Sequence, residues 1–208
     1  MIKRDLEGFF DIVCFIVISL LMNGKLKVGL VHGMGADKDW ECFPWLEAEL
    51  SVVDVSVDRR SIDPEKGRRG SLLKNPDEWE NFAAQYLDSR VGVVGHSVGG
   101  IALLRALESY EGAPLKFLLL VASYARVFET EKKGLAKRII PILEMRDGFD
   151  WEAIESKVDT IVVMGSMDDP HVPVEEVEFL AGKLGVSPTI YQDKGHFGGI
   201  EFPELKKQ

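Results

Sequence analysis

The stretch Val91-Gly-Val-Val-Gly-His-Ser-Val-Gly-Gly100 decides the fold of this chain. Its first half is a short apolar run that favours a strand, and the next seven residues, Ile101-Ala-Leu-Leu-Arg-Ala-Leu107, favour a helix. Between them lies Ser97, with Gly95 two positions before it and Gly99 two positions after it. A serine in so sharp a strand-to-helix turn needs small residues at those two positions. The stretch therefore predicts a strand, a tight turn that carries Ser97, and a helix that starts beside the serine.

A serine in such a turn is suited to nucleophilic attack. The turn would project its hydroxyl above the edge of the sheet, where the helix N-terminus stabilises developing negative charge. The backbone N–H of Val98 would then be one donor of an oxyanion hole. A glycine-rich turn that only packs tightly, or that cradles a phosphate, has the same pattern. The motif therefore needs partners elsewhere in the chain.

Composition indicates a single globular domain. The chain has 208 residues, of which 46% are hydrophobic and 28% are charged, values that are ordinary for globular proteins. The net charge of −9 argues against nucleic acid as a partner. The two cysteines, Cys14 and Cys42, are too few for a disulfide framework, and neither has metal-ligating neighbours at a useful spacing. We therefore expect a cytoplasmic protein without a metal site.

The first 21 residues are expected to form an apolar extension. The run 9–21 is strongly apolar, but it is short for a membrane span and Asp11 interrupts it. As a signal peptide it is poor, because Asp5 and Glu7 dilute the basic start and no cleavage site of the A-x-A type follows. Two interpretations stay open, namely that translation begins at Met22 or that residues 1–21 anchor the protein peripherally to a membrane. Residues 22–208 are predicted to be one domain in either case.

Strands and helices are expected to alternate along that domain. Apolar runs predict strands at 26–31, 52–57, 91–94, 115–121, 160–164 and 188–191. Helical patterns occupy 40–50, 76–87, 101–107 and 174–184. This alternation predicts an α/β fold whose mostly parallel sheet has helices on both faces. The less regular segment 122–151 is either a cap over the site or an ordinary crossover connection.

Three polar groups follow the ends of predicted strands, in the order Ser97, then Asp168 or Asp169, then His196. A serine is a weak nucleophile near neutral pH and needs an adjacent base. An imidazole, with an ordinary pKa of about 6.5, suits that task, and an aspartate would hold it in one tautomer. Either aspartate could instead cap the next helix. His171 is a rival base, although it precedes the last strand rather than following it.

The first predicted strand ends in the glycine-rich turn His32-Gly-Met-Gly35. At the carboxyl edge of a parallel sheet, such a turn is placed to contact a ligand. The backbone N–H of Met34 would then be the second oxyanion donor, beside that of Val98. His32 is expected to pack within the turn rather than to act in catalysis. A plain connection between strand and helix remains the alternative.

Three segments carry a resemblance to a known family, namely 95–99, 165–173 and 193–197. They read Gly-His-Ser-Val-Gly, Gly-Ser-Met-Asp-Asp-Pro-His-Val-Pro and Asp-Lys-Gly-His-Phe. With them, the chain resembles the small serine hydrolases of the YdeN and retinoblastoma-binding-protein-nine type. The resemblance implies an α/β-hydrolase fold with a minimal cap, which hydrolyses small esters or amides without a cofactor. It also implies that the catalytic acid is the aspartate directly before proline, Asp169.

Together these observations predict a serine hydrolase with the catalytic triad Ser97, Asp169 and His196. The N–H groups of Met34 and Val98 are the predicted oxyanion hole. Two alternatives use the same fold. One is a non-catalytic protein-interaction module, although the sequence contains no recognisable partner-binding motif. The other is an acyltransferase that uses the same triad.

Overall fold

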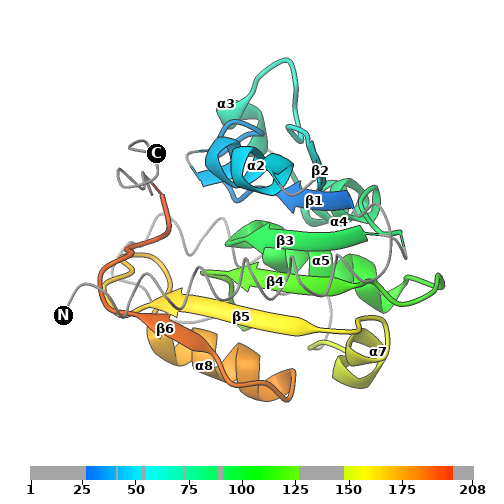
Figure 1. The fold of residues 1–208 in the computed structure, drawn as a ribbon, viewed down its shortest axis with the longest axis vertical. Helices are drawn as coiled ribbons and strands as arrows, with labels where there is room; N and C mark the ends of the chain where they lie inside the picture. The colour runs from blue at the N-terminus through cyan, green and yellow to red at the C-terminus, as the bar shows by residue number, and fades with distance from the viewer. Residues whose placement is uncertain are drawn as a thin grey trace.

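The computed structural model describes residues 27–40, 42–52, 55–72, 74–88, 91–126 and 148–198 (Figure 1). The predicted extension at 1–21 and most of the segment predicted as a cap or crossover, at 127–147, lie outside these residues. Within the described part, six strands form one sheet in the order β2-β1-β3-β4-β5-β6. Every neighbouring pair of strands in it is parallel. The predicted α/β architecture is confirmed.

The elements alternate along the chain as predicted. The strands are β1 (Lys27–Val31), β2 (Ser56–Arg59), β3 (Val91–His96), β4 (Phe117–Val121), β5 (Ile161–Ser166) and β6 (Thr189–Tyr191). The described helices are α2 (Cys42–Val52), α3 (Arg68–Ser71), α4 (Pro76–Ala84), α5 (Val98–Glu108), α7 (Trp151–Glu155) and α8 (Val174–Lys183). Among the described residues, no helix is long and apolar enough to span a bilayer.

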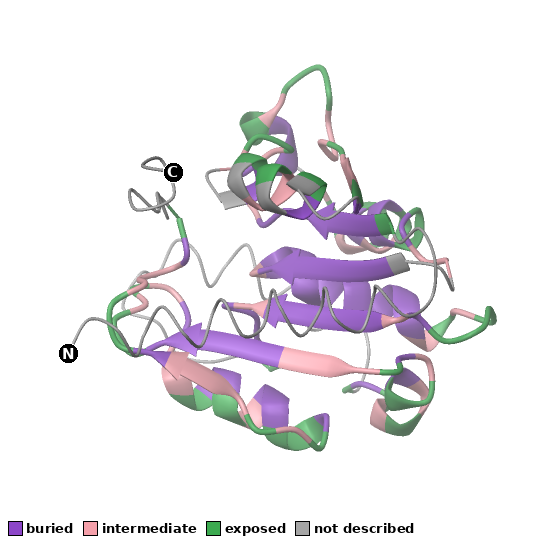
Figure 2. Cartoon of the chain, in the orientation of Figure 1, coloured by how far each residue is buried: buried purple, intermediate pink, exposed green. Residues whose placement is uncertain are grey.

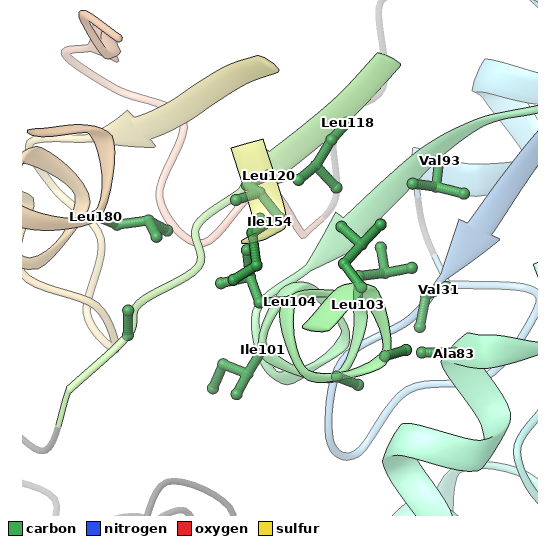
Figure 3. Packing of buried hydrophobic residues seen from close by; sticks show 14 of the residues in the cluster. Val31, Ala83, Val93, Ile101, Leu103, Leu104, Leu118, Leu120, Ile154 and Leu180 are labelled. Atoms are coloured by element: carbon green, nitrogen blue, oxygen red, sulfur yellow. The ribbon is translucent and has the colours of Figure 1, made fainter. Parts of the chain in front are cut away.

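Side chains from β4 pack against helices on both faces of the sheet. Leu118 and Leu120 belong to the cluster that α4, α5, α7 and α8 share (Figure 3). Phe117 and Leu119 belong to a second cluster with Phe43 of α2. Successive side chains of a strand point to opposite faces, so the two clusters lie on opposite sides of the sheet. The four β4 side chains are all buried (Figure 2), which is why this strand has an uninterrupted apolar sequence.

Helix α4 begins where the sequence predicts. The Asn75 side chain accepts a hydrogen bond from the Glu78 N–H, and the Glu78 carboxylate accepts one from the Asn75 N–H, each at 2.9 Å. This reciprocal cap satisfies two backbone donors at the helix start. Trp79 and Phe82, on the inner face of the helix, are 0% and 5% exposed. Both side chains lie in the hydrophobic core.

The predicted strand at 52–57 is wrong at its start. Helix α2 continues to Val52, and β2 begins at Ser56. The valine-rich sequence favours a strand locally, but Phe43 and Leu50 of α2 pack into the second cluster. The Val55 N–H then bonds the Leu50 carbonyl at 3.1 Å and closes the helix end. Because packing keeps Val52 in the helix, β2 begins about one helical turn later in the chain than predicted.

Candidate active site

The turn after β3 holds Ser97 in a strained conformation. Its φ of 53° and ψ of −120° lie in a region that residues with a side chain rarely adopt. Such strain costs about 1–3 kcal/mol and is typical of functional sites. The two flanking glycines are required by close approach, because a Cβ on Gly95 would lie 2.6 Å from the Cα of Gly100 and one on Gly99 would lie 2.6 Å from the carbonyl oxygen of His32. The structure therefore confirms the strand-turn-helix predicted from the sequence.

Ser123 supports this turn from the segment that follows β4. Its side chain is fully buried, and its hydroxyl lies 3.1 Å from the carbonyl oxygen of Ser97. A Cβ on Gly100 would come within 2.8 Å of the Ser123 Cβ, so the two segments are in close contact. Ser123 was not predicted from the sequence. The signal in the sequence that could have identified it is that a small polar residue follows β4, a strand that pairs with β3.

We expect Ser97→Gly to raise the thermal stability of the protein. Glycine adopts a positive φ without strain, and its larger unfolded-state entropy offsets only part of that gain, which leaves about 1 kcal/mol. For a domain of this size the melting temperature should rise by about 2–4 °C. Ser97→Ala is the matched control, because it removes the hydroxyl but keeps the strained Cβ. Equal melting temperatures for the two variants in circular dichroism would contradict the prediction.

The turn after β1 lies directly beside Ser97. A Cβ on Gly33 would lie 3.1 Å from the Cβ of Ser97. The turn is held by hydrogen bonds from the Gly35 N–H to the Ser71 hydroxyl, at 2.9 Å, and from the Ala36 N–H to the Gly33 carbonyl, at 3.3 Å. Met34 is partly buried and packs against the core. The structure thus brings the predicted oxyanion turn and the predicted nucleophile together.

His32 is a packing residue of this turn. Its side chain is fully buried, its Nε2 accepts a hydrogen bond from the Ile62 N–H at 3.1 Å, and its Nδ1 lies 2.9 Å from the Gly33 carbonyl oxygen. The two bonds require the neutral ring with its proton on Nδ1. Burial lowers the pKa of His32, which favours the same neutral form. The side chain therefore fixes the backbone of the turn, as the sequence predicts.

The loops after β5 and β6 bring Asp169 and His196 into contact. The His196 Nδ1 lies 2.8 Å from the Asp169 Oδ2, and the two side chains are 17% and 1% exposed. The other oxygen of the carboxylate, Oδ1, accepts hydrogen bonds from the backbone N–H groups of His171 at 2.8 Å and Val172 at 3.0 Å. Because a carboxylate accepts, the Nδ1 of His196 carries the proton in this pair. The imidazole is thereby held in one orientation and one tautomer.

Asp168 binds the backbone of the His196 loop instead of the imidazole. Its Oδ1 accepts a hydrogen bond from the Ser166 hydroxyl at 2.6 Å and another from the Gly195 N–H at 2.8 Å. These two donors, the hydroxyl first, lower the pKa of the Asp168 carboxyl. Neither aspartate caps α8, because the N-cap position of that helix is Pro173. The capping alternative from the sequence is therefore wrong for both.

The rival base His171 also lies at the site. Its ring is edge-to-face with that of His196, with the centroids 4.8 Å apart. The backbone N–H of His171 donates a hydrogen bond to the Asp169 Oδ1 at 2.8 Å. Asp169 therefore orients the imidazole of His196, with His171 packed beside it.

The fold is that of the α/β-hydrolases. The ydeN gene product of B. subtilis is similar, with a TM-score of 0.72 and 24% identity over 87% of this chain and 95% of that chain. Polyneuridine aldehyde esterase is another similar structure, with a TM-score of 0.60 and 15% identity over 88% of this chain and 96% of that one. At these identities the likeness establishes the fold.

A model of the serine hydrolase family matches residues 29–201, so the chain belongs to that family. Its match to the rat serine hydrolase RBBP9 has 30% identity over 123 residues, which are 58% of this chain and 60% of the rat protein. The alignment thus spans about three fifths of that relative. The resemblance to small hydrolases of the YdeN and RBBP9 type, inferred from the sequence, is confirmed.

Proposed function

We propose that the protein hydrolyses small ester or amide substrates through an acyl-enzyme formed on Ser97. The observation that carries this proposal is the contact of 2.8 Å between the His196 Nδ1 and the buried Asp169 carboxylate. It lies at the sheet edge where the strained Ser97 turn also lies, because all the paired strands are parallel. A nucleophile, a base and a group that orients the base are the parts that acyl transfer requires.

In the first half of the reaction, the Ser97 hydroxyl oxygen attacks the substrate carbonyl carbon. Its proton passes to the Nε2 of His196, which has the lone pair because Nδ1 carries the proton donated to Asp169. The Asp169 carboxylate stabilises the imidazolium that forms. The N–H groups of Met34 and Val98 bind the oxygen that becomes negatively charged. These donors are part of a rigid turn and a helix N-terminus, so they need little reorganisation.

In the second half, His196 returns the proton to the leaving alcohol or amine as the bond to the carbonyl carbon breaks. The acyl group is then an ester of Ser97. A water molecule gives a proton to His196 and attacks this ester, and the carboxylic acid is released as Ser97 regains its proton. An acyltransferase would use an alcohol or amine in place of the water.

The substrate class is supported by proteins that share the fold. One structural neighbour is named as polyneuridine aldehyde esterase, and another as a puromycin-hydrolysing peptidase of Mycobacterium tuberculosis, with a TM-score of 0.61. The same fold thus occurs in a protein named as an esterase and within a protein named as a peptidase, of which the match covers 31%. We propose a carboxylesterase or a peptidase for this chain.

Labelling with a fluorophosphonate tests the proposal. We expect one adduct on the wild-type protein, mapped to Ser97 by peptide mass spectrometry, and none on Ser97→Ala. Esters of increasing acyl length and short peptide amides would then define the substrate preference. A folded wild-type protein that is not labelled would contradict the proposal and would favour the non-catalytic interaction module.

A further inference from the structure

His96, the residue before Ser97, makes a hydrogen bond that the proposed reaction does not use. Its Nε2 lies 2.8 Å from the backbone carbonyl oxygen of His196. The side chain is only 2% exposed, so this bond is shielded from water. It directly links the strand that carries the proposed nucleophile to the loop that carries the proposed base.

The hydrogen bond has a defined direction. A carbonyl oxygen can only accept, so the Nε2 of His96 must carry the proton and donate it. Burial, and then the neighbouring His196 imidazole, lower the pKa of His96 to about 3. His96 therefore stays neutral near neutral pH and places no positive charge beside His196.

The ring of His96 also packs between two other rings. The indole of Trp40 stacks on it with a centroid distance of 5.8 Å and an interplanar angle of 28°. The imidazole of His196 meets it edge-to-face, with a centroid distance of 4.8 Å and an angle of 62°. His96 thus contacts His196 twice, through the carbonyl oxygen and through the ring.

Ser97 and His196 do not follow adjacent strands of the sheet. Pairing between neighbouring strands therefore does not by itself fix the distance between these two residues. Ser97 follows β3 and His196 follows β6, and both β4 and β5 lie between these strands. On the side of β5, the loop is fixed by bonds from the Lys194 N–H to the Ser166 hydroxyl, at 2.9 Å, and from the Gly195 N–H to Asp168. The hydrogen bond of His96 ties the same loop to β3.

We propose that His96 is a positioning residue that holds the His196 imidazole in place for proton transfer from Ser97. This inference rests on the proposed function, because it assigns His96 a task within that reaction. His96 acts through His196 and neither takes nor gives the transferred proton itself. Its loss should therefore slow the chemical step more than it weakens substrate binding.

Three substitutions of His96 separate the hydrogen bond from the bulk of the side chain. In His96→Gln the amide nitrogen reaches about as far as Nε2, so it can still donate to the His196 carbonyl. In His96→Asn the amide nitrogen falls near the position of Nδ1 and does not reach. His96→Met keeps a comparable volume without any donor. The measurements are kcat and KM on an activated p-nitrophenyl ester, the rate of fluorophosphonate labelling, and the melting temperature.

We expect His96→Met and His96→Asn to lower kcat and the labelling rate by about 10- to 100-fold, the typical effect of misplacing a reacting group by about 1 Å. KM should change by less than about twofold, because a group that acts only in the transition state affects kcat and leaves KM unchanged. His96→Gln should recover most of the lost rate. This recovery separates positioning from a structural role, since Gln and Asn both remove the aromatic ring.

The outcomes for His96 and for the proposed function are distinguishable. If wild type is labelled at Ser97 but His96→Met and His96→Asn retain its kcat and labelling rate, the positioning role is overturned and the proposed function stands. Equal rates for His96→Gln and His96→Asn would also overturn it, and this pair decides the question should His96→Met fail to fold. If folded wild type is not labelled, the proposed function and this inference are both overturned.

Discussion

His196→Ala is expected to lower kcat by about 10⁶-fold, the loss seen when a triad histidine is removed from a serine hydrolase. The imidazole is the group that accepts the Ser97 proton in the proposed reaction, and without it the hydroxyl is a weak nucleophile near neutral pH. Fluorophosphonate labelling should be lost together with ester hydrolysis, although Ser97 remains intact. Steady-state kinetics on an activated ester, with the melting temperature measured in parallel, checks the prediction.

His171→Ala is the matched control for this variant. The centroids of the two histidine rings are 4.8 Å apart, so the two substitutions remove neighbouring imidazoles from the same part of the candidate site. The backbone N–H that His171 donates to Asp169 survives the change. We expect a loss of less than about tenfold, below the range for loss of acid–base catalysis, because the His171 ring takes no part in the proposed proton transfer. If His171→Ala were inactive and His196→Ala active, the base would be His171.

Asp169→Asn is expected to lower kcat by about 10⁴-fold, through the tautomer of His196. The Oδ1 of Asp169 accepts two backbone N–H groups, so the amide oxygen of asparagine will occupy that position. Its NH₂ group then replaces Oδ2, the oxygen that lies 2.8 Å from the His196 Nδ1. The Nδ1 contact with Oδ2, at 2.8 Å, is shorter than its contact with Oδ1, at 3.0 Å. Because NH₂ donates, this shorter contact requires Nδ1 to accept, and the ring proton moves to Nε2. The lone pair that should receive the Ser97 proton is then lost.

Asp168→Asn tests the neighbouring carboxylate with the same chemical change. One oxygen of Asp168 accepts both of its short hydrogen bonds, from Ser166 and from Gly195. The carbonyl oxygen of asparagine can accept both bonds, so the loop keeps its position. We expect kcat to fall by less than about tenfold, below the range for loss of acid–base catalysis. Kinetics of the two variants, side by side, decide which aspartate acts, and a larger loss in Asp168→Asn would reassign the role.

Local sequence patterns were a good guide where packing and propensity agree. The apolar run of β4 and the first turn of α4 each satisfy both requirements, so β4 ends and α4 begins where predicted. Propensity and packing disagree at Val52. Its β-branched side chain favours a strand, although the residue is the last one of α2. No local rule could decide this boundary, because it depends on where Phe43 and Leu50 meet the sheet.

The sequence by itself determined the order of strands and helices, the turn at Ser97, and the three loops that carry the predicted triad. These features depend on short-range requirements, namely apolar periodicity and small residues beside a sharp turn. Only the tertiary structure decided what each side chain in those loops contacts. Asp168 and Asp169 are neighbours in the chain, but one binds the Gly195 N–H and the other the His196 imidazole. These different partners of Asp168 and Asp169, and the bond from His96 to the His196 carbonyl, depend on contacts between loops that follow separate strands. Such contacts cannot be predicted from local sequence.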